Sequence, residues 1–134
     1  MLNLINSQNP AGNDGLANFI QLKSPSDGGL QIAKNFIYDT SGRVLAEQNP
    51  YFTSVSTSLS NISSSVPFVN YTYDTLGRVV RVTNQDGTNK TIVFDRNTIT
   101  AYDELSHRKS YILDGHDRIT NVLEYNNDLL EAEI

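Results

Sequence analysis

The sequence contains no cysteine, so it can form neither a disulfide framework nor a zinc site built from thiolates. It also lacks any apolar run approaching the roughly 20 residues that a membrane-spanning helix needs. Its ten basic residues are scattered among fifteen acidic ones, for a net charge of −5, which argues against a nucleic-acid-binding surface. The first 15 residues lack the charged and apolar regions of a signal peptide. These absences leave a globular domain of ordinary composition.

A short phrase recurs along the chain. Its copies are FIYDTSGRVLAEQNPY at 36–51, YTYDTLGRVVRVTNQDGT at 71–88 and SYILDGHDRITNVLEY at 110–125. In the second copy, Tyr71 and Tyr73 share one face of an extended chain, because side chains alternate along a strand. After a polar break, Val79, Val80 and Val82 again favour a strand. The phrase therefore predicts a strand, a turn and a second strand.

The polar break has the chemistry of a type I turn closed by a left-handed residue. Asp74 at the first position can accept hydrogen bonds from the backbone two residues on, and Gly77 at the fourth permits a positive φ. Asp39 and Gly42 stand at these positions in the first copy. In the third copy Asp117 replaces the glycine, which is tolerable because aspartate enters the left-handed region more readily than most residues.

Further turn signals fall between the copies, eight to eleven residues apart. They begin at Asp74, Asn84, Asp95, Asp103 and Asp114, and segments rich in β-branched and aromatic residues separate them. This spacing is typical of an all-β meander. We therefore expect an all-β fold, an array of antiparallel β-hairpins that is continuous from residue 68 to residue 125.

Composition divides the chain into five parts. We expect an irregular segment at 1–29 with a strand near 16–23, followed by a first repeat unit at 30–52 with a strand at 30–38. A Ser/Thr-rich connection at 53–67, contiguous hairpins at 68–125 and an acidic tail at 126–134 complete the chain. A lone hairpin is marginal in water, and repeated units bury their apolar faces by stacking on neighbours. We therefore expect a piece of a longer array, whose exposed strand edges favour self-association.

The repeated residues resemble the YD repeat of Rhs-type proteins, teneurins and the B and C components of bacterial Tc toxins, whose pattern runs roughly D-P-x-G-x-x-x-x-Y-x-Y-D-x-x-G-R-L. The resemblance covers about residues 30–125. The positions that carry it are Tyr38, Asp39, Gly42, Arg43, Tyr71, Tyr73, Asp74, Gly77, Arg78, Asp103, Tyr111, Asp114 and Arg118. The last copy is degenerate, since it departs from the pattern at Glu104, Ser106, Leu113 and Asp117.

The resemblance implies a β-sheet that spirals into a large hollow shell, which encloses a toxic or effector polypeptide. It implies a secreted or cell-surface bacterial protein whose export signal lies outside this chain. The implied partners are the remainder of the shell and the enclosed polypeptide. From the charge and the composition we expect no nucleic acid and no membrane span, and we expect no cofactor. The alternative is a binding module, an adhesion or glycan-binding β-array, which an exposed aromatic cluster on one face would mark.

Catalysis by the repeated Asp and Arg residues is disfavoured, because a set that recurs in every unit cannot all be one active site. We expect each Asp to cap its turn and each Arg to pair with that Asp or to stack on a Tyr ring. An enzyme using these carboxylates should instead show strongly raised pKa values. His107 and His116 lie on separate turns without a third ligand, so no metal site is expected. No nucleophile elbow or phosphate-binding loop is present, and we expect no enzyme activity.

Overall fold

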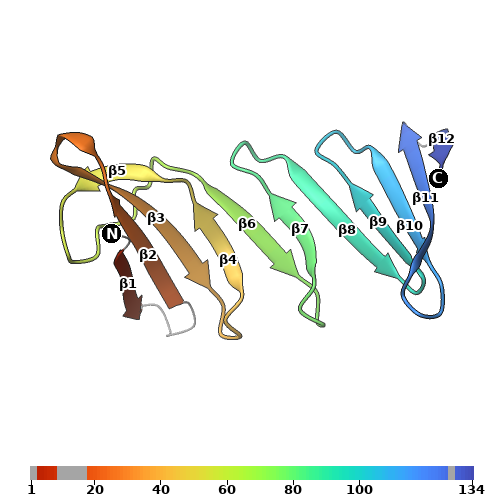
Figure 1. Ribbon diagram of the computed structural model, residues 1–134, viewed down its shortest axis with the longest axis horizontal. Coiled ribbons are helices and arrows are strands. Elements are labelled where there is room, and N and C mark those ends of the chain that lie inside the picture. Colours follow the sequence, from red (N-terminus) through yellow and green to blue (C-terminus); the bar gives the residue numbers. More distant parts are fainter. Residues whose placement is uncertain (1–2, 9–17, 127–128) are drawn as a thin grey trace. The chain divides into compact units, whose positions relative to one another are not determined.

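The structure, a computed structural model, describes residues 3–8, 18–126 and 129–134. Antiparallel β-strands are the main regular elements of these residues (Figure 1). The all-β fold and the hairpin array predicted from the sequence are confirmed. A 3-10 turn at Asp27–Gly29 is the one helical element in these ranges, so none of the described residues forms a helix able to cross a bilayer. The chain divides into two compact units, residues 1–70 and 71–134.

The first unit is a sheet built around its longest strand, β3 (Leu30–Tyr38), which lies where the sequence predicts it. The strand order is β1-β2-β3-β4-β6, from β1 (Asn3–Gln8), β2 (Asn18–Pro25), β4 (Val44–Gln48) and β6 (Phe68–Tyr73). The first half of β3 also pairs with β5 (Tyr51–Ser54). Because β3 is nine residues long, it holds β5 along residues 30–33 and β4 along residues 36–38.

Two strands lie in segments where the sequence predicts none. Residues 3–8, within the expected irregular segment, form β1 and pair with β2 from Asn3 opposite Lys23 to Gln8 opposite Asn18. Within the expected acidic tail, β12 (Leu129–Glu133) pairs with β11 (Ile119–Asn126). The expectation of irregular structure was wrong for residues 3–8, and the strand in the tail was not predicted, because pairing with a neighbouring strand, which no local pattern reveals, satisfies the backbone of these segments. Residues 9–17 of the expected irregular segment lie outside the described residues.

The second unit is a meander in which spatial order follows chain order (Figure 1). Its strands before β11 and β12 are β7 (Val79–Thr83), β8 (Asn89–Asp95), β9 (Thr98–Tyr102) and β10 (Arg108–Leu113). Directly opposite residues share a face, as in the row formed by Ile92, Ala101, Lys109 and Glu124. The strands and turns predicted for this part of the chain are confirmed.

Few described side chains are fully buried, and most of those are polar. The apolar ones are Ala33 and Ala46, and the polar ones are Gln21, Lys23, Asn35, Gln48 and Ser110. Most other strand residues are half-buried. The sheets are therefore held mainly by their backbone ladders and cross-strand side-chain pairs, and the buried polar residues require hydrogen-bond partners.

Candidate functional site

Five hairpin turns share one set of backbone hydrogen bonds. In each, the amide of the first residue donates to the carbonyl of the fifth, and the amide of the fourth donates to the carbonyl of the first; the first residues are Asp39, Asp74, Asn84, Asp103 and Asp114. The fourth residue has a positive φ, which is 77° at Gly42, 82° at Gly77, 85° at Gly87, 66° at Ser106 and 60° at Asp117. The degenerate copy thus keeps the glycine-turn geometry, and the predicted turns are confirmed.

In four of these turns the first residue is an aspartate that caps the turn. Its Oδ1 accepts hydrogen bonds of 2.8–3.1 Å from the amides two and four residues on. Its Oδ2 pairs with the fifth side chain, at 2.6 Å from Arg43, 2.8 Å from Arg78, 2.9 Å from His107 and 2.8 Å from Arg118. The aspartate and the fifth residue therefore fix one turn conformation in each of these four copies.

Arg78 also stacks on an aromatic ring. Its guanidinium carbon lies 3.9 Å from the centroid of the Phe94 ring on β8. The sequence predicts a tyrosine in this role, and the ring that Arg78 contacts is a phenylalanine. Since exposed ion pairs contribute little to stability, the Asp74–Arg78 pair acts chiefly to position this stack and the turn.

The capping aspartates have pKa values below the ordinary value. For Asp39 and Asp74 the main cause is the hydrogen bond from the backbone amide of the arginine in the fifth position, and for Asp114 it is the bond from the His116 amide. At Asp103 desolvation acts to raise the pKa, but the hydrogen bonds from His107 outweigh it. A carboxyl that serves as a general acid needs a raised pKa, so these shifts run opposite to the catalytic reading.

The predicted motif residues stay at their own turns and are not gathered into one site. Separate turns hold Asp39, Gly42 and Arg43 between β3 and β4; Asp74, Gly77 and Arg78 between β6 and β7; Asp103 between β9 and β10; and Asp114 and Arg118 between β10 and β11. The motif tyrosines Tyr38, Tyr71, Tyr73 and Tyr111 are half-buried on strands.

The two histidines also lie on separate turns, and Nδ1 of His107 is paired with Oδ2 of Asp103. The part of the chain that the structure describes contains no cluster of three or more His, Asp or Glu side chains placed to hold a metal ion.

A row of buried polar side chains crosses three strands of the first unit. Gln21 on β2 lies opposite Asn35 on β3, and its Nε2 donates to Asn35 Oδ1 at 2.8 Å. Asn35 Nδ2 donates to Oε1 of Gln48, on β4, at 2.6 Å. The Tyr51 hydroxyl accepts from both Gln21 and Asn35, at 3.3 and 3.0 Å. These four residues and Lys23 are called the polar ladder below.

Residues 55–66, from the Ser/Thr-rich connection, cover the polar ladder. Gln48 Nε2 donates to the carbonyls of Ser63 and Val66 at 2.6 and 2.7 Å. Gln21 exchanges two hydrogen bonds with Ser60, donating to its carbonyl at 3.2 Å and accepting from its amide at 2.9 Å. As expected, no regular element lies between β5 and β6, but this connection is bound to the sheet.

Lys23 lies two residues beyond Gln21 and is 1% exposed. Its Nζ donates to the carbonyls of Ser58 and Ser56 at 2.6 and 3.2 Å. Burial disfavours the charged amine and lowers the pKa of Lys23. Among the described residues, carbonyl oxygens are the groups that hold this amine, so its burial depends on residues 55–66 staying in place.

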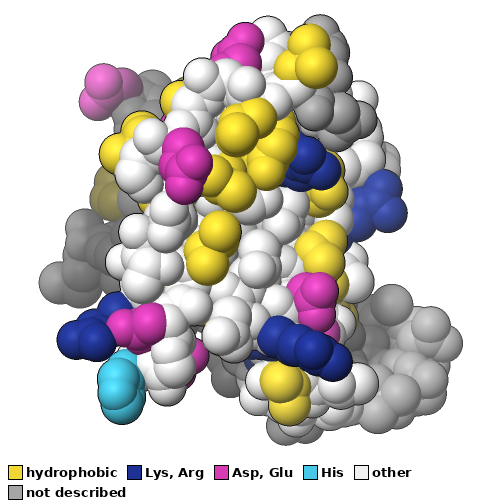
Figure 2. Space-filling model, turned by 90° about the vertical axis from the view of Figure 1, so that its right-hand side faces the viewer, with side chains coloured by type: hydrophobic (Ala, Val, Ile, Leu, Met, Phe, Trp, Pro, Cys, Tyr) yellow, Lys and Arg dark blue, Asp and Glu magenta, His cyan; other side chains and the backbone are white. Residues whose placement is uncertain are grey.

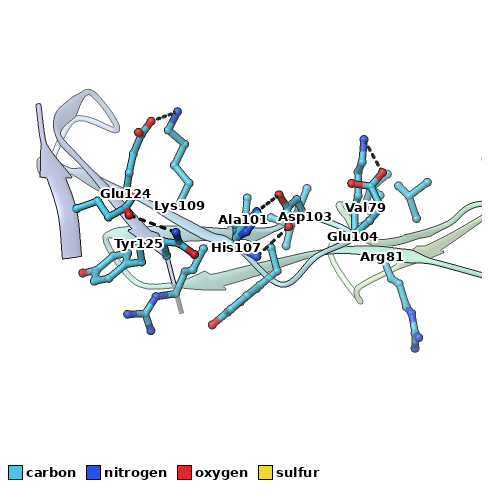
Figure 3. A pocket seen from close by; sticks show the side chains of 16 residues that line it. Val79, Arg81, Ala101, Asp103, Glu104, His107, Lys109, Glu124 and Tyr125 are labelled. Atoms are coloured by element: carbon cyan, nitrogen blue, oxygen red, sulfur yellow. Dashed lines mark hydrogen bonds and ion pairs between the residues drawn. The ribbon is translucent and has the colours of Figure 1, made fainter. Parts of the chain in front are cut away.

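The second unit holds an open groove of about 640 Å³ (Figure 3). Lys109 and Glu124, which are cross-strand partners on β10 and β11, form an ion pair of 2.5 Å there, and Glu124 raises the pKa of Lys109. Lys90 and Glu104 form a second pair of 3.2 Å. Both signs of charge are interleaved along this groove, which therefore has no strong selectivity for cations or anions.

The polar ladder is missing from the sequence-based expectations. Its only local signal is polar residues at alternate positions, such as Gln21 and Lys23 on β2, and these read equally well as a solvent-facing strand surface. Their burial follows from where residues 55–66 lie, which is a long-range contact.

No protein-family model matches the chain, and no curated protein matches it either. The YD-repeat resemblance therefore remains a prediction from the repeated residues, and the function is inferred from the geometry described above.

Proposed function

We propose that this chain is a non-catalytic structural segment of a YD-repeat shell of the Rhs or Tc-toxin type, a wall that encloses a toxic or effector polypeptide. The observation that carries the proposal is the repeated capped turn, in which the same hydrogen bonds recur at Asp39, Asp74, Asp103 and Asp114. A device repeated at successive hairpins serves the sheet as a whole, because each copy fixes the register of its own strand pair.

The state of the carboxylates supports a structural role. The Oδ1 of each capping aspartate accepts hydrogen bonds from two backbone amides, and its Oδ2 pairs with a side chain. At Asp74 these groups are the amides of Leu76 and Arg78 and the guanidinium of Arg78. A carboxylate held in this way, with a lowered pKa, stays ionised and is already occupied at neutral pH. It therefore supports turn capping in preference to proton transfer.

The edge of the second unit supports continuation of the sheet. Among the described residues β12 pairs with β11 alone, and the apolar side chains of Leu129, Leu130 and Ile134 on and beside it are exposed. Figure 2 views this side and shows apolar side chains at the surface next to acidic ones. An edge of this kind accepts a further strand, from the rest of a longer shell or from a second copy.

The resemblance alone underlies the remaining parts of the proposal, namely a bacterial origin and a secreted or cell-surface location.

A glycan-binding module is the second candidate, and the groove of the second unit favours it. Arg108 lies with its guanidinium carbon 3.9 Å from the centroid of the Tyr125 ring, and both residues line the groove beside Tyr102. Aromatic faces beside charged and hydrogen-bonding groups suit a sugar. Protection of Tyr102 or Tyr125 from chemical labelling by added glycans would favour this candidate.

Mass spectrometry of the native product purified from its source tests the shell. We expect a C-terminal polypeptide, continuous or cleaved, that resists added protease until the shell is unfolded. A product with no protected polypeptide would contradict the shell and favour the binding module.

A further inference from the structure

The polar ladder forms hydrogen bonds with the main chain of residues 55–66 and not with their side chains. Besides the bonds of Gln21 and Gln48, Lys23 Nζ donates to the carbonyls of Ser56 and Ser58, and the Tyr51 hydroxyl donates to the carbonyl of Asn61 at 3.2 Å. Two amides of the segment are also bound, because Ser60 donates to Gln21 and Ser56 donates to Oε1 of Gln31 at 3.0 Å. The carbonyl contacts use a group that every amino acid possesses, and the two amide contacts use a group that every amino acid except proline possesses.

The side chains of the segment contribute little to this contact. Those of Thr57, Ser58, Asn61, Ser64 and Ser65 are exposed. Among the hydroxyl groups of residues 55–66, that of Ser60 forms a hydrogen bond with a described strand residue, accepting from Thr53 Oγ1 at 3.3 Å. The hydroxyls of Ser56 and Ser63 bond inside the segment, to Ser58 and Ser65. Most of these side chains therefore form no hydrogen bond with the sheet that depends on their identity.

The bound carbonyls are spread along a segment that is bent and not extended. The chain bends at Thr57 and Ser58 and turns at residues 64 and 65, and the carbonyls of the neighbouring residues Ser60 and Asn61 both accept from the ladder. The side-chain donors of the ladder thus fit the bent main chain of this segment. Recognition of this kind takes its affinity from main-chain hydrogen bonds.

We propose that the polar ladder is a main-chain-binding groove, that residues 55–66 are its built-in occupant, and that it takes polypeptide which adopts the same bent backbone with amides at the positions of Ser56 and Ser60. An added peptide with the same backbone replaces the segment once the segment is displaced, whatever the order of its side chains. The inference does not depend on the shell, because it concerns contacts inside the first unit. It therefore stands or falls separately from the proposed function.

The test opens the groove in the full chain with Ser60→Pro, which removes the amide that donates to Gln21. The matched control is Ser64→Pro. Ser64 is the second residue of the turn closed by the Val66 amide on the Ser63 carbonyl, a position that favours proline. The probes are a fluorescein-labelled peptide VSTSLSNISSSV, the sequence of residues 55–66, and a scrambled version of it.

Fluorescence anisotropy should show that the Ser60→Pro protein binds both peptides with affinities within about threefold of each other, a difference well below 1.4 kcal/mol. The unchanged protein and the Ser64→Pro control should bind roughly tenfold or more weakly, because the tethered segment competes at an effective concentration in the millimolar range. Adding Gln48→Leu to Ser60→Pro should remove the binding. A folded Ser60→Pro protein that binds neither peptide, or only the native order, overturns the proposal.

A second measurement needs no variant and decides the matter if Ser60→Pro does not fold. Hydrogen exchange at the Ser60 amide of the unchanged protein should accelerate when scrambled peptide is added in millimolar excess, because the peptide holds the segment away from Gln21. An exchange rate that stays the same at every peptide concentration overturns the proposal.

Discussion

The Oδ2 atom of Asp74 accepts a hydrogen bond from Nε of Arg78 at 2.8 Å, while the same guanidinium group stacks 3.9 Å from the centre of the Phe94 ring. One arginine thus links the cap of a hairpin turn to the strand β8. At the corresponding position of the β9–β10 turn, His107 pairs with Asp103 in the same way. The turn conformation therefore tolerates different side chains at its fifth position, and asparagine in place of aspartate at its first position in the Asn84 turn, while the positive φ is kept.

The positive φ of the fourth turn residue is tested by a pair of glycine substitutions. Gly42→Ala should lower the free energy of unfolding by about 1 kcal/mol, because its φ of 77° is unfavourable for a residue with a Cβ. Gly115→Ala is the control, since its added Cβ also meets nothing within 4 Å and its φ is not positive. Gly77→Val should cost at least as much as Gly42→Ala. Equal unfolding free energies for the two alanine variants would contradict the turn geometry.

The capping aspartates predict acid sensitivity. The pKa values of Asp39, Asp74 and Asp114 are lower in the folded state than the ordinary value, so the unfolded state binds more protons in acid. Their contribution is complete above the unfolded pKa, near 3.9, and is lost as the pH falls through the folded values. The urea midpoint should therefore fall between about pH 5 and pH 2.

Asp74→Asn is the matched variant, because Asn84 already occupies the same position in another turn. The variant should keep the turn and show a smaller fall of the urea midpoint in acid. The same fall in both proteins would show that Asp74 does not contribute.

The polar ladder predicts a costly core substitution. Asn35→Leu removes the donor to Gln48 Oε1 and one of the three acceptors of Gln21 Nε2, and a buried polar group left unpaired costs about 1–3 kcal/mol. Lys34→Met is the control on the opposite face, where it breaks the partly exposed pair with Glu47 and should cost about 1 kcal/mol or less. Chemical unfolding measures both. A smaller effect for Asn35→Leu than for Lys34→Met would contradict the ladder.

Two lysines should titrate on opposite sides of the ordinary value of 10.5, Lys23 below it because of burial and Lys109 above it because of Glu124. Since the folded pKa of Lys23 is lowered, it favours folding more at high pH, and this contribution is lost as the pH falls through the folded pKa. NMR of the lysine side-chain carbons measures both midpoints. Identical midpoints would contradict the burial of Lys23.

The sequence predicts what is encoded locally. Asp74 and Gly77, three residues apart, specify their turn by themselves, and Val79, Val80 and Val82 specify a strand. By contrast, Leu129 and Leu130 become strand residues only by pairing with β11. Gln21 becomes a buried residue only because Ser60, 39 positions away, lies over it. The polar ladder therefore could not be derived from any short window of the chain.

Access of thiol reagents to the two faces of β8 tests the proposed wall most directly. The chain has no cysteine of its own, so single Lys90→Cys and Val93→Cys variants each place one thiol in it, whose labelling is read from the β8 peptide. Both positions are exposed and, three residues apart, lie on opposite faces of the strand. In the native product a bulky maleimide should label one of the two positions and leave the other unlabelled until unfolding. Equal labelling of both positions in the native product would contradict a wall that separates an interior from solvent.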